Sequence, residues 1–337
     1  MWGKSIAAMS MMYMLQLKTL VVTTTTVIRD MWAEEIKQHF GIDPCIIGGG
    51  KVINPDSPIA VGNIQTVEKV IQKTAGEYGL LIIDECHHCS ATTFTKVLNV
   101  SRASTKIGLS GTPTRRDGKH VLFQDFFSFK RFIGKDENRL TPTIWEFESD
   151  VSIPSNAMIP WAVRANTVME DEVYIQEVIL IAKCLEMLGH RVLIVADRVE
   201  FLTRVHEALP YSRMICGKVA STVEERKEVM DDIKAGRATS ICATQSIFAE
   251  GVSLNELSAL VPASLISGEE LLEQLIGRIQ RESKTHPKDP ISIDIKMKGN
   301  TGRGQYYKRK ALYVREGWEI IKQSRGSLLS MANKAME

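Results

Sequence analysis

The stretch LLIIDECHHCS, residues 80–90, contains two chemical patterns that predict different sites. Asp84 and Glu85 end an apolar run typical of a buried parallel strand, and a carboxylate there projects from the carboxyl edge of the sheet. That position suits a magnesium–nucleotide site. The run from Cys86 to Cys89 consists of four residues that commonly bind metals, which suggests zinc instead.

Zinc is the less favoured interpretation of this stretch. Tetrahedral zinc sites commonly use two separated ligand pairs, and no second CxxC or HxxxH pair follows Cys89. Adjacent side chains also point in divergent directions, so residues 86–89 cannot all reach one ion. We therefore expect no stoichiometric zinc, and we expect Asp84 to hold Mg²⁺ while Glu85 acts as the base for an attacking water.

Length and composition are those of a soluble globular protein with reduced thiols. The 337 residues are enough for two domains, and a net charge of +2 requires any nucleic-acid binding to come from local basic clusters. Six cysteines are scattered, mostly within apolar runs, which is typical of the reduced thiols of a cytoplasmic protein. The N-terminal apolar stretch lacks a cleavage site and is too short to span a bilayer, so it predicts a buried first helix and no membrane association.

Short apolar runs alternate with helical patterns in two successive parts of the chain, which predicts an α/β fold with two mostly parallel sheets flanked by helices. The apolar runs lie at 19–24, 59–64, 80–84, 106–111, 191–196, 212–217, 239–244, 259–265 and 291–295. Polar, irregular sequence fills much of the region between the two parts. We expect a first lobe at 1–146, a crossing at 147–171 and a second lobe at 172–337, with a ligand cleft between the lobes.

The tripeptide Gly3-Lys4-Ser5 matches the end of a phosphate loop, GxxxxGK[ST]. In that motif the lysine binds the β- and γ-phosphates, and the serine hydroxyl binds Mg²⁺. The motif should begin five residues before Gly3, but only Met1 and Trp2 precede it, and the strand that should feed the loop is absent. We therefore expect a chain truncated within this motif that is a poor ATPase by itself.

Seven segments together resemble the motifs of a superfamily 2 helicase of the DExH type. That group includes phage recombination helicases, the transcription/repair-factor helicase and restriction-enzyme motor subunits. The segments follow the family's order over nearly the whole chain, although Thr23 and Ser253 stand where many relatives have proline and aspartate. They are GKS (3–5), VVTTTTVIRDMW (21–32), VGNIQTV (61–67), DECH (84–87), LSGTPTR (109–115), ATQSIFAEGVSL (243–254) and QLIGRIQRE (274–282).

The resemblance implies two tandem RecA-like lobes that couple ATP hydrolysis, with Mg²⁺, to movement on DNA. It assigns ATP binding to Gly3, Lys4, Ser5, Asp84, His87 and Gly251, with Ser5 and Asp84 on the Mg²⁺. It assigns catalysis to Glu85, Gln274, Arg278 and Arg281, and coupling between the lobes to Ser110 and Thr112. We expect the two arginines to lie one turn apart on a helix over 269–282, so that both can act as arginine fingers.

Short polar side chains at several motif positions suit contacts to a sugar–phosphate backbone. They are Thr24, Gln65, Thr66 and Thr244. Basic clusters at Arg115–Lys119 and Lys308–Lys310 are further candidates for this role. The resemblance favours DNA, single-stranded or branched, over RNA, with an accessory nuclease or recombination proteins as partners. The glycine run at 46–51 imitates a phosphate loop, but we interpret it as a turn.

A second interpretation is a helicase relic that binds nucleic acid or acts as a scaffold without efficient ATP turnover. The incomplete phosphate loop is the feature that supports it. ATP turnover stimulated by single-stranded or branched DNA would distinguish the two interpretations.

Overall fold

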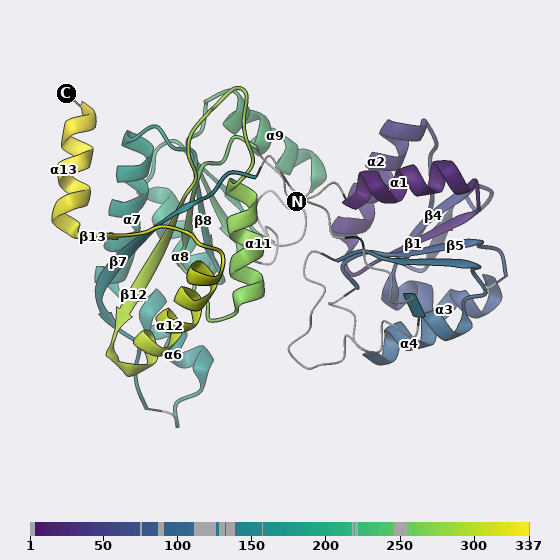
Figure 1. Ribbon diagram of the computed structural model, residues 1–337, viewed down its shortest axis with the longest axis horizontal. Coiled ribbons are helices and arrows are strands. Elements are labelled where there is room, and N and C mark those ends of the chain that lie inside the picture. The colour runs from purple at the N-terminus through teal and green to yellow at the C-terminus, as the bar shows by residue number, and fades with distance from the viewer. Residues whose placement is uncertain are drawn as a thin grey trace. The chain divides into compact units, whose positions relative to one another are not determined.

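The structure is a computed structural model in which the chain divides into two compact units, Met1–Asp136 (unit 1) and Glu137–Glu337 (unit 2). Each unit is built around its own sheet (Figure 1). No helix among the described residues is long and apolar enough to cross a membrane. The described residues are 4–74, 76–86, 91–110, 126–127, 132, 139–156, 158–217, 219, 222–245 and 255–336.

Unit 1 contains a six-stranded sheet in the order β3-β2-β4-β1-β5-β6. Every neighbouring pair is parallel except the β2–β3 hairpin. The strands are β1 (Thr19–Thr23), β2 (Cys45–Gly48), β3 (Lys51–Ile53), β4 (Ile59–Asn63), β5 (Leu80–Ile83) and β6 (Thr105–Gly108). The helices are α1 (Lys4–Leu15), α2 (Thr26–Phe40), α3 (Ile64–Thr74) and α4 (Ala91–Val100).

The sheet of unit 1 is covered on both faces, and its central strands β4, β1 and β5 are buried along almost their whole length. Leu20 and Val22 of β1 pack in a cluster with α3 and α4, whereas Val21 packs in a cluster with α1 and α2. These two pairs of helices cover opposite faces of the sheet (Figure 1). Residues along a strand point alternately to opposite faces, so an uninterrupted apolar run is what a sheet buried on both sides requires.

The glycine run and the first helix of unit 1 have well-defined conformations in the structure. The glycine run does form a turn, because Gly49 and Gly50 have φ of +59° and +74° between the antiparallel strands β2 and β3. Positive φ at both turn residues is typical of a tight hairpin. The first helix is buried on one side only: Met9 and Met12 lie in the core, whereas Tyr13 and Met14 are 69% and 79% exposed.

Unit 2 contains a seven-stranded parallel sheet in the order β13-β7-β12-β11-β8-β10-β9. The strands are β7 (Thr143–Ser152), β8 (Val192–Ala196), β9 (Ser212–Ile215), β10 (Ser240–Thr244), β11 (Ala259–Pro262), β12 (Ile291–Lys298) and β13 (Ile320–Gln323). The helices are α6 (Trp161–Met169), α7 (Glu172–Met187), α8 (Val199–Glu207), α9 (Val223–Lys234), α11 (Glu269–Ile279), α12 (Gly299–Arg315) and α13 (Arg325–Met336).

The sheet of unit 2 also separates two apolar layers. Leu193 and Val195 of β8 pack in a cluster with α9, α11 and α12. Val192 and Ile194 pack in a cluster with α7, α8 and α13 on the other face. The predicted α/β class, with two mostly parallel sheets flanked by helices, is therefore confirmed.

The boundary between the two parts differs from the expected one. Residues 147–171 do not form a crossing, because β7 pairs with both β12 and β13 and α6 follows it within unit 2. Acidic residues along β7 hide its strand pattern in the sequence. The most deeply placed of them, Glu146, is only 6% exposed and accepts a hydrogen bond from the Tyr306 hydroxyl.

Candidate functional site

Four parallel strands of unit 1 bring several of the predicted residues to one edge of the sheet. Thr23 pairs with Asn63, and Val22 pairs with Ile83, so β4, β1 and β5 end side by side. The residues that follow these strands therefore lie at the carboxyl edge, where open α/β sheets bind ligands. They are Gln65 and Thr66 after β4, Thr24 after β1, Asp84 and Glu85 after β5, and Ser110 after β6.

A salt bridge joins the two ends of the predicted nucleotide site. Lys4 is the first residue of α1, and its Nζ lies 2.7 Å from Oε1 of Glu85, 81 positions further along the chain. Both side chains are largely shielded from water, with exposures of 15% and 22%. The fold therefore brings together the lysine and the carboxylate that the sequence assigned separately to phosphate binding and to catalysis.

Asp84 is buried, and both of its carboxylate oxygens accept hydrogen bonds. The indole Nε1 of Trp32 donates to Oδ2 at 2.8 Å, and the main-chain N–H of Glu85 donates to Oδ1 at 2.8 Å. Burial, and then repulsion from the Glu85 carboxylate, raise the pKa of Asp84 above its ordinary value. A carboxylate held this way has a fixed orientation before any ligand binds.

The backbone at Glu85 adopts an unusual conformation. Its φ is +45°, in the left-handed region that costs a non-glycine residue about 1–2 kcal/mol. Main-chain hydrogen bonds hold the residues on both sides, from Asp84 N to Val22 O at 2.9 Å and from Cys86 N to Leu109 O at 3.0 Å. Backbone strain retained by its surroundings is concentrated at functional sites in proteins, which agrees with the role predicted for Glu85.

Helix α2 contributes two residues to this site that the sequence reasoning missed. Trp32 binds Asp84, and Glu35, one turn later, accepts a hydrogen bond from the side chain of Ser5. Burial is the largest influence on Glu35 and raises its pKa, while Ser5 lowers it. The sequence does contain one indication of this pair. An indole and a carboxylate are spaced i, i+3 on a helix whose other inward residues are Ile28 and Ile36.

The donor atoms gathered here fit magnesium. Asp84 offers a carboxylate and Ser5 a hydroxyl, and Mg²⁺ prefers such hard oxygen ligands, commonly one or two carboxylates completed by water and substrate phosphates. Among the described residues no group of three or more His, Cys, Asp or Glu is arranged to hold a metal ion. His87, His88 and Cys89 lie outside those residues, so the expectation about zinc stays a prediction.

In unit 2 the predicted helix over 269–282 is shorter than expected. Helix α11 carries Gln274 and Arg278 but ends at Ile279, so Arg281 does not lie on it and the expected one-turn spacing of the arginines on a single helix is wrong. The chain after α11 pairs with the segment before β7. Arg139 forms a β-bridge with Arg281, and Leu140 N donates to Gln280 O at 2.9 Å.

The neighbouring side chains stabilise this departure from the helix. Arg139 Nε donates to Gln280 Oε1 at 2.6 Å, and Gln280 Nε2 donates to Leu140 O at 3.0 Å. These bonds replace the ones that another helical turn would have made. Arg278 is only 4% exposed, whereas Arg281 is half-buried.

Thr244 lies at the carboxyl edge of the second sheet. It ends β10 and pairs with Ala196, the last residue of β8. Ser264, which follows β11, donates a hydrogen bond to Asp197, which follows β8, at 3.2 Å between oxygens. The polar groups at the ends of these adjacent strands therefore gather at one edge, as those of unit 1 do.

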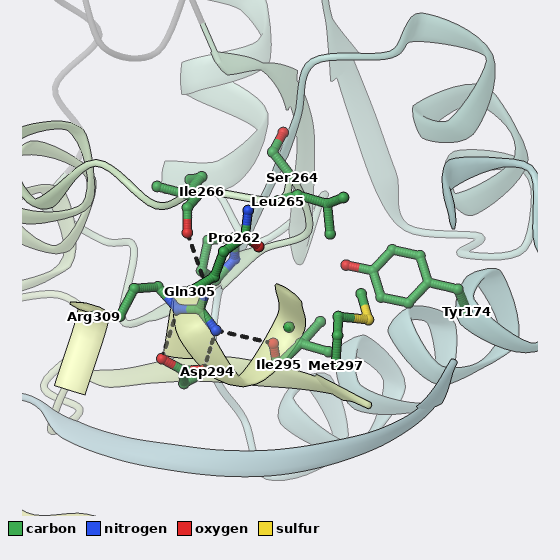
Figure 2. A pocket seen from close by; sticks show the side chains of 11 residues that line it. Tyr174, Pro262, Ser264, Leu265, Ile266, Asp294, Ile295, Met297, Gln305 and Arg309 are labelled. Carbon is green, nitrogen blue, oxygen red and sulfur yellow. Dashed lines mark hydrogen bonds and ion pairs between the residues drawn. The ribbon is translucent and has the colours of Figure 1, made fainter. Parts of the chain in front are cut away.

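The basic cluster at 308–310 is not a single exposed surface. Arg309 is 7% exposed and points toward Asp294, to which Nη2 donates at 2.6 Å and Nε at 2.9 Å (Figure 2). It also donates to the carbonyls of Ile266 and Ile295. Arg309 is thus a structural cation in the interior of unit 2, and the prediction that it contacts nucleic acid is wrong.

The remaining predicted residues lie outside the described part of the chain. They are Gly3, His87, Thr112, Arg115 and Gly251, together with Arg116 and Lys119 of the first basic cluster.

Comparisons with known proteins match both halves of the chain. The family model "Type III restriction enzyme, res subunit" matches residues 2–115, and "Helicase conserved C-terminal domain" matches residues 174–283. The chain is 44% identical over 338 residues to the probable helicase D10 of Escherichia phage T5, covering 99% of this chain and 74% of that protein.

Two further similarities concern a shorter segment and the fold. The chain is 30% identical over 121 residues to the DNA 3'-5' translocase XPB2 of Sulfurisphaera tokodaii, which covers 36% of this chain and 27% of that protein. The solved structure of S. cerevisiae Dbp5 bound to RNA and ADP BeF3 matches with a TM-score of 0.67 at 12% identity, covering 99% of this chain and 87% of that one. The match to Dbp5 shows that the two chains share the same tandem fold.

Proposed function

Because this chain belongs to the superfamily 2 helicases, a family of nucleic-acid-dependent ATP hydrolases, we propose that it is an ATP-driven translocase or helicase that acts on DNA. The observation that carries the proposal is the cluster of Lys4, Ser5, Asp84 and Glu85 at the carboxyl edge of the first sheet. A cation for phosphate, two hard oxygen ligands and a candidate base meet there. These are the groups that phosphoryl transfer to water requires.

Lys4 and Glu85 each have a defined task in this proposal. The Lys4 ammonium binds the β- and γ-phosphates, and these phosphates compete with Glu85 for it because the two side chains are paired at 2.7 Å. Glu85, once released from Lys4, accepts a proton from the attacking water. ATP binding would therefore also free the catalytic base.

Ser5 and Asp84 would hold Mg²⁺. The bound ion would neutralise negative charge on the phosphate oxygens. Trp32 and Glu35 orient these two ligands through the hydrogen bonds that they make to them. We assign Arg278 and Arg281 to stabilising charge on the transferred phosphoryl group, with Gln274 supporting them.

The nucleic acid would contact the edges at which the polar residues gather. Thr24, Gln65 and Thr66 in unit 1, and Thr244 in unit 2, are short donors that can bind sugar and phosphate without reading the sequence. The similarity to a DNA translocase and to a phage helicase supports DNA. The RNA bound to Dbp5 makes RNA the alternative to test.

Steady-state ATP turnover tests the proposal directly. Turnover would be measured alone, with a 30-nucleotide single-stranded DNA and with an RNA of the same sequence, and Glu85→Gln would serve as the inactive control. We expect DNA to stimulate turnover more than RNA does. Stronger stimulation by RNA would refute the assignment to DNA, and no stimulation by either would refute the motor.

A further inference from the structure

Helix α12 carries an unusual concentration of positive charge. Its 17 residues include Arg303, Lys308, Arg309, Lys310 and Arg315 but no carboxylate. Asp294 neutralises Arg309, and Glu269 neutralises Arg315 at 2.9 Å. The other three cations form no ion pair with any residue that the structure describes, so this helix presents a net positive surface.

An exposed aromatic ring lies among these charges. Tyr307 is 64% exposed, and its ring centroid lies 5.5 Å from that of Tyr306, which is turned inward. The ammonium of Lys310 lies 5.7 Å from the Tyr306 ring. Spacings of four and three residues place Arg303, Tyr307 and Lys310 along one side of the helix. Lys308 is also exposed, but it lies about 100° further around the helix from Tyr307.

We propose that this α12 surface, formed by Arg303, Tyr307, Lys308 and Lys310, binds single-stranded DNA in addition to the motif residues. The proposal rests on the proposed function. The three cations would contact phosphates, and Tyr307 would stack on a base, the combination by which proteins hold single strands without reading sequence. An acidic protein segment would satisfy the cations but would make no comparable use of an exposed ring.

The place of α12 in the fold agrees with this occupant. The helix starts directly after β12, at the carboxyl edge that also carries Thr244 at the end of β10. In the sheet β12 and β10 are three strand spacings apart. That separation is about 14 Å, which about four nucleotides cover at roughly 3.4 Å each along a strand. One strand in contact with Thr244 could therefore continue to Arg303.

Fluorescence anisotropy with a labelled 20-nucleotide single-stranded DNA tests the α12 surface in the full chain. We expect Tyr307→Ala to weaken binding roughly 5- to 100-fold, the range that loss of one stacked base produces. We expect Lys308→Ala to lower the slope of log affinity against log salt by about 0.7, as loss of one phosphate contact does for single strands.

Matched controls are available on other parts of unit 2. Tyr211 is 65% exposed and precedes the edge strand β9, and Lys183 is exposed on α7, on the opposite face of the sheet. Tyr211→Ala and Lys183→Ala should bind DNA as the parent does. Circular dichroism would show that all four variants are folded.

The outcomes separate this inference from the proposed function. If the parent binds DNA and the α12 variants bind as tightly as their controls, the α12 surface is refuted and the motor proposal stands. If the parent binds no single-stranded DNA, both are refuted. A base-to-protein crosslink from 4-thiothymidine DNA that maps to Tyr307 would support the surface directly, and crosslinks confined to other segments would contradict it.

Discussion

The indole of Trp32 donates a hydrogen bond to the carboxylate of Asp84, with 2.8 Å between Nε1 and Oδ2. The two residues are 52 positions apart, and Trp32 is 2% exposed. An indole N–H can only donate, so this contact favours the ionised carboxylate and fixes its rotation. A tryptophan outside the predicted site residues therefore orients the residue proposed to bind Mg²⁺.

Replacing Trp32 by phenylalanine keeps an aromatic ring and removes only the donor. We expect Trp32→Phe to weaken Mg²⁺-dependent binding of ADP about 10- to 100-fold, the usual consequence of losing a partner of a metal ligand. Isothermal titration of ADP with and without Mg²⁺ measures this effect. ADP affinity without Mg²⁺ should change little.

The control for this prediction is Trp318→Phe. Trp318 is also buried, at 8% exposure, but it packs in unit 2 beside Tyr313. It should leave the Mg²⁺ dependence unchanged. Equal losses in the two variants would mean that Trp32 acts through general stability.

Glu85→Gln removes the proposed base and also releases Lys4 from its salt bridge. We expect ATP turnover to fall at least about 10²-fold, while ATP binds as tightly as before or more tightly because no carboxylate competes for Lys4. DNA binding should stay within a few-fold. Glu77→Gln is the control, since Glu77 is exposed and pairs with Lys18. Turnover near the parent value would remove Glu85 from the mechanism.

Arg281→Ala tests the proposed arginine finger more cleanly than Arg278→Ala would, because Arg278 is buried and its loss would also disturb packing. We expect hydrolysis to slow about 10²-fold or more with little change in ATP affinity, since such a residue acts mainly in the transition state. Single-turnover kinetics and ATP titration separate the two effects. Arg204→Ala, an exposed arginine on α8 paired with Glu172, should have no effect.

Arg309→Met should destabilise unit 2 by about 3–5 kcal/mol, because it leaves Asp294 as a buried charge without its cation. The Tyr313 hydroxyl also donates to Asp294, at 2.6 Å, but a neutral donor cannot replace the charge. Lys308→Ala, one position away but exposed, should change stability little. Urea unfolding compares the two. Similar stabilities would contradict the interior role of Arg309.

The stability of unit 2 should fall below about pH 6. Burial, and then the charge of Lys288, lower the pKa of His190 from 6.5 to about 4, and its Nδ1 lies 3.1 Å from Ser258 Oγ. The unfolded chain therefore protonates His190 more readily than the folded chain does. As a result, the stability of unit 2 rises with pH between about 4 and 6.5. Linkage gives a loss of about 2 kcal/mol at pH 5 relative to neutral pH.

His190→Asn should remove most of that pH dependence. Denaturant-dependent hydrogen exchange of β8 at pH 7 and pH 5 measures it within unit 2. The pKa of the nearby His286 is also lowered, first by burial, so part of the effect should persist. A pH dependence that is the same in the variant and the parent would contradict the prediction.

Local sequence patterns were sufficient to predict the class of fold and most of the residues at the strand ends. Short apolar runs such as 80–83, alternating with helical patterns, indicate strands buried on both faces, and a carboxylate that follows such a strand lies at the edge of the sheet. These inferences depend on neighbours within a few positions. Apolar runs did not predict β7, because acidic residues alternate along this strand. Its Glu146 can be buried because it accepts a hydrogen bond from Tyr306, 160 positions away.

The folded structure was needed to establish which distant side chains meet and which charges are buried. The pairing of Lys4 with Glu85 and of Trp32 with Asp84 depends on how two helices pack on the sheet. The end of α11 before Arg281 depends on a bridge to Arg139. Arg309 and Lys308 look alike in the sequence, but one is buried against Asp294 and the other is exposed. Local patterns cannot distinguish them, because burial and pairing are set by contacts between segments that are far apart in the chain.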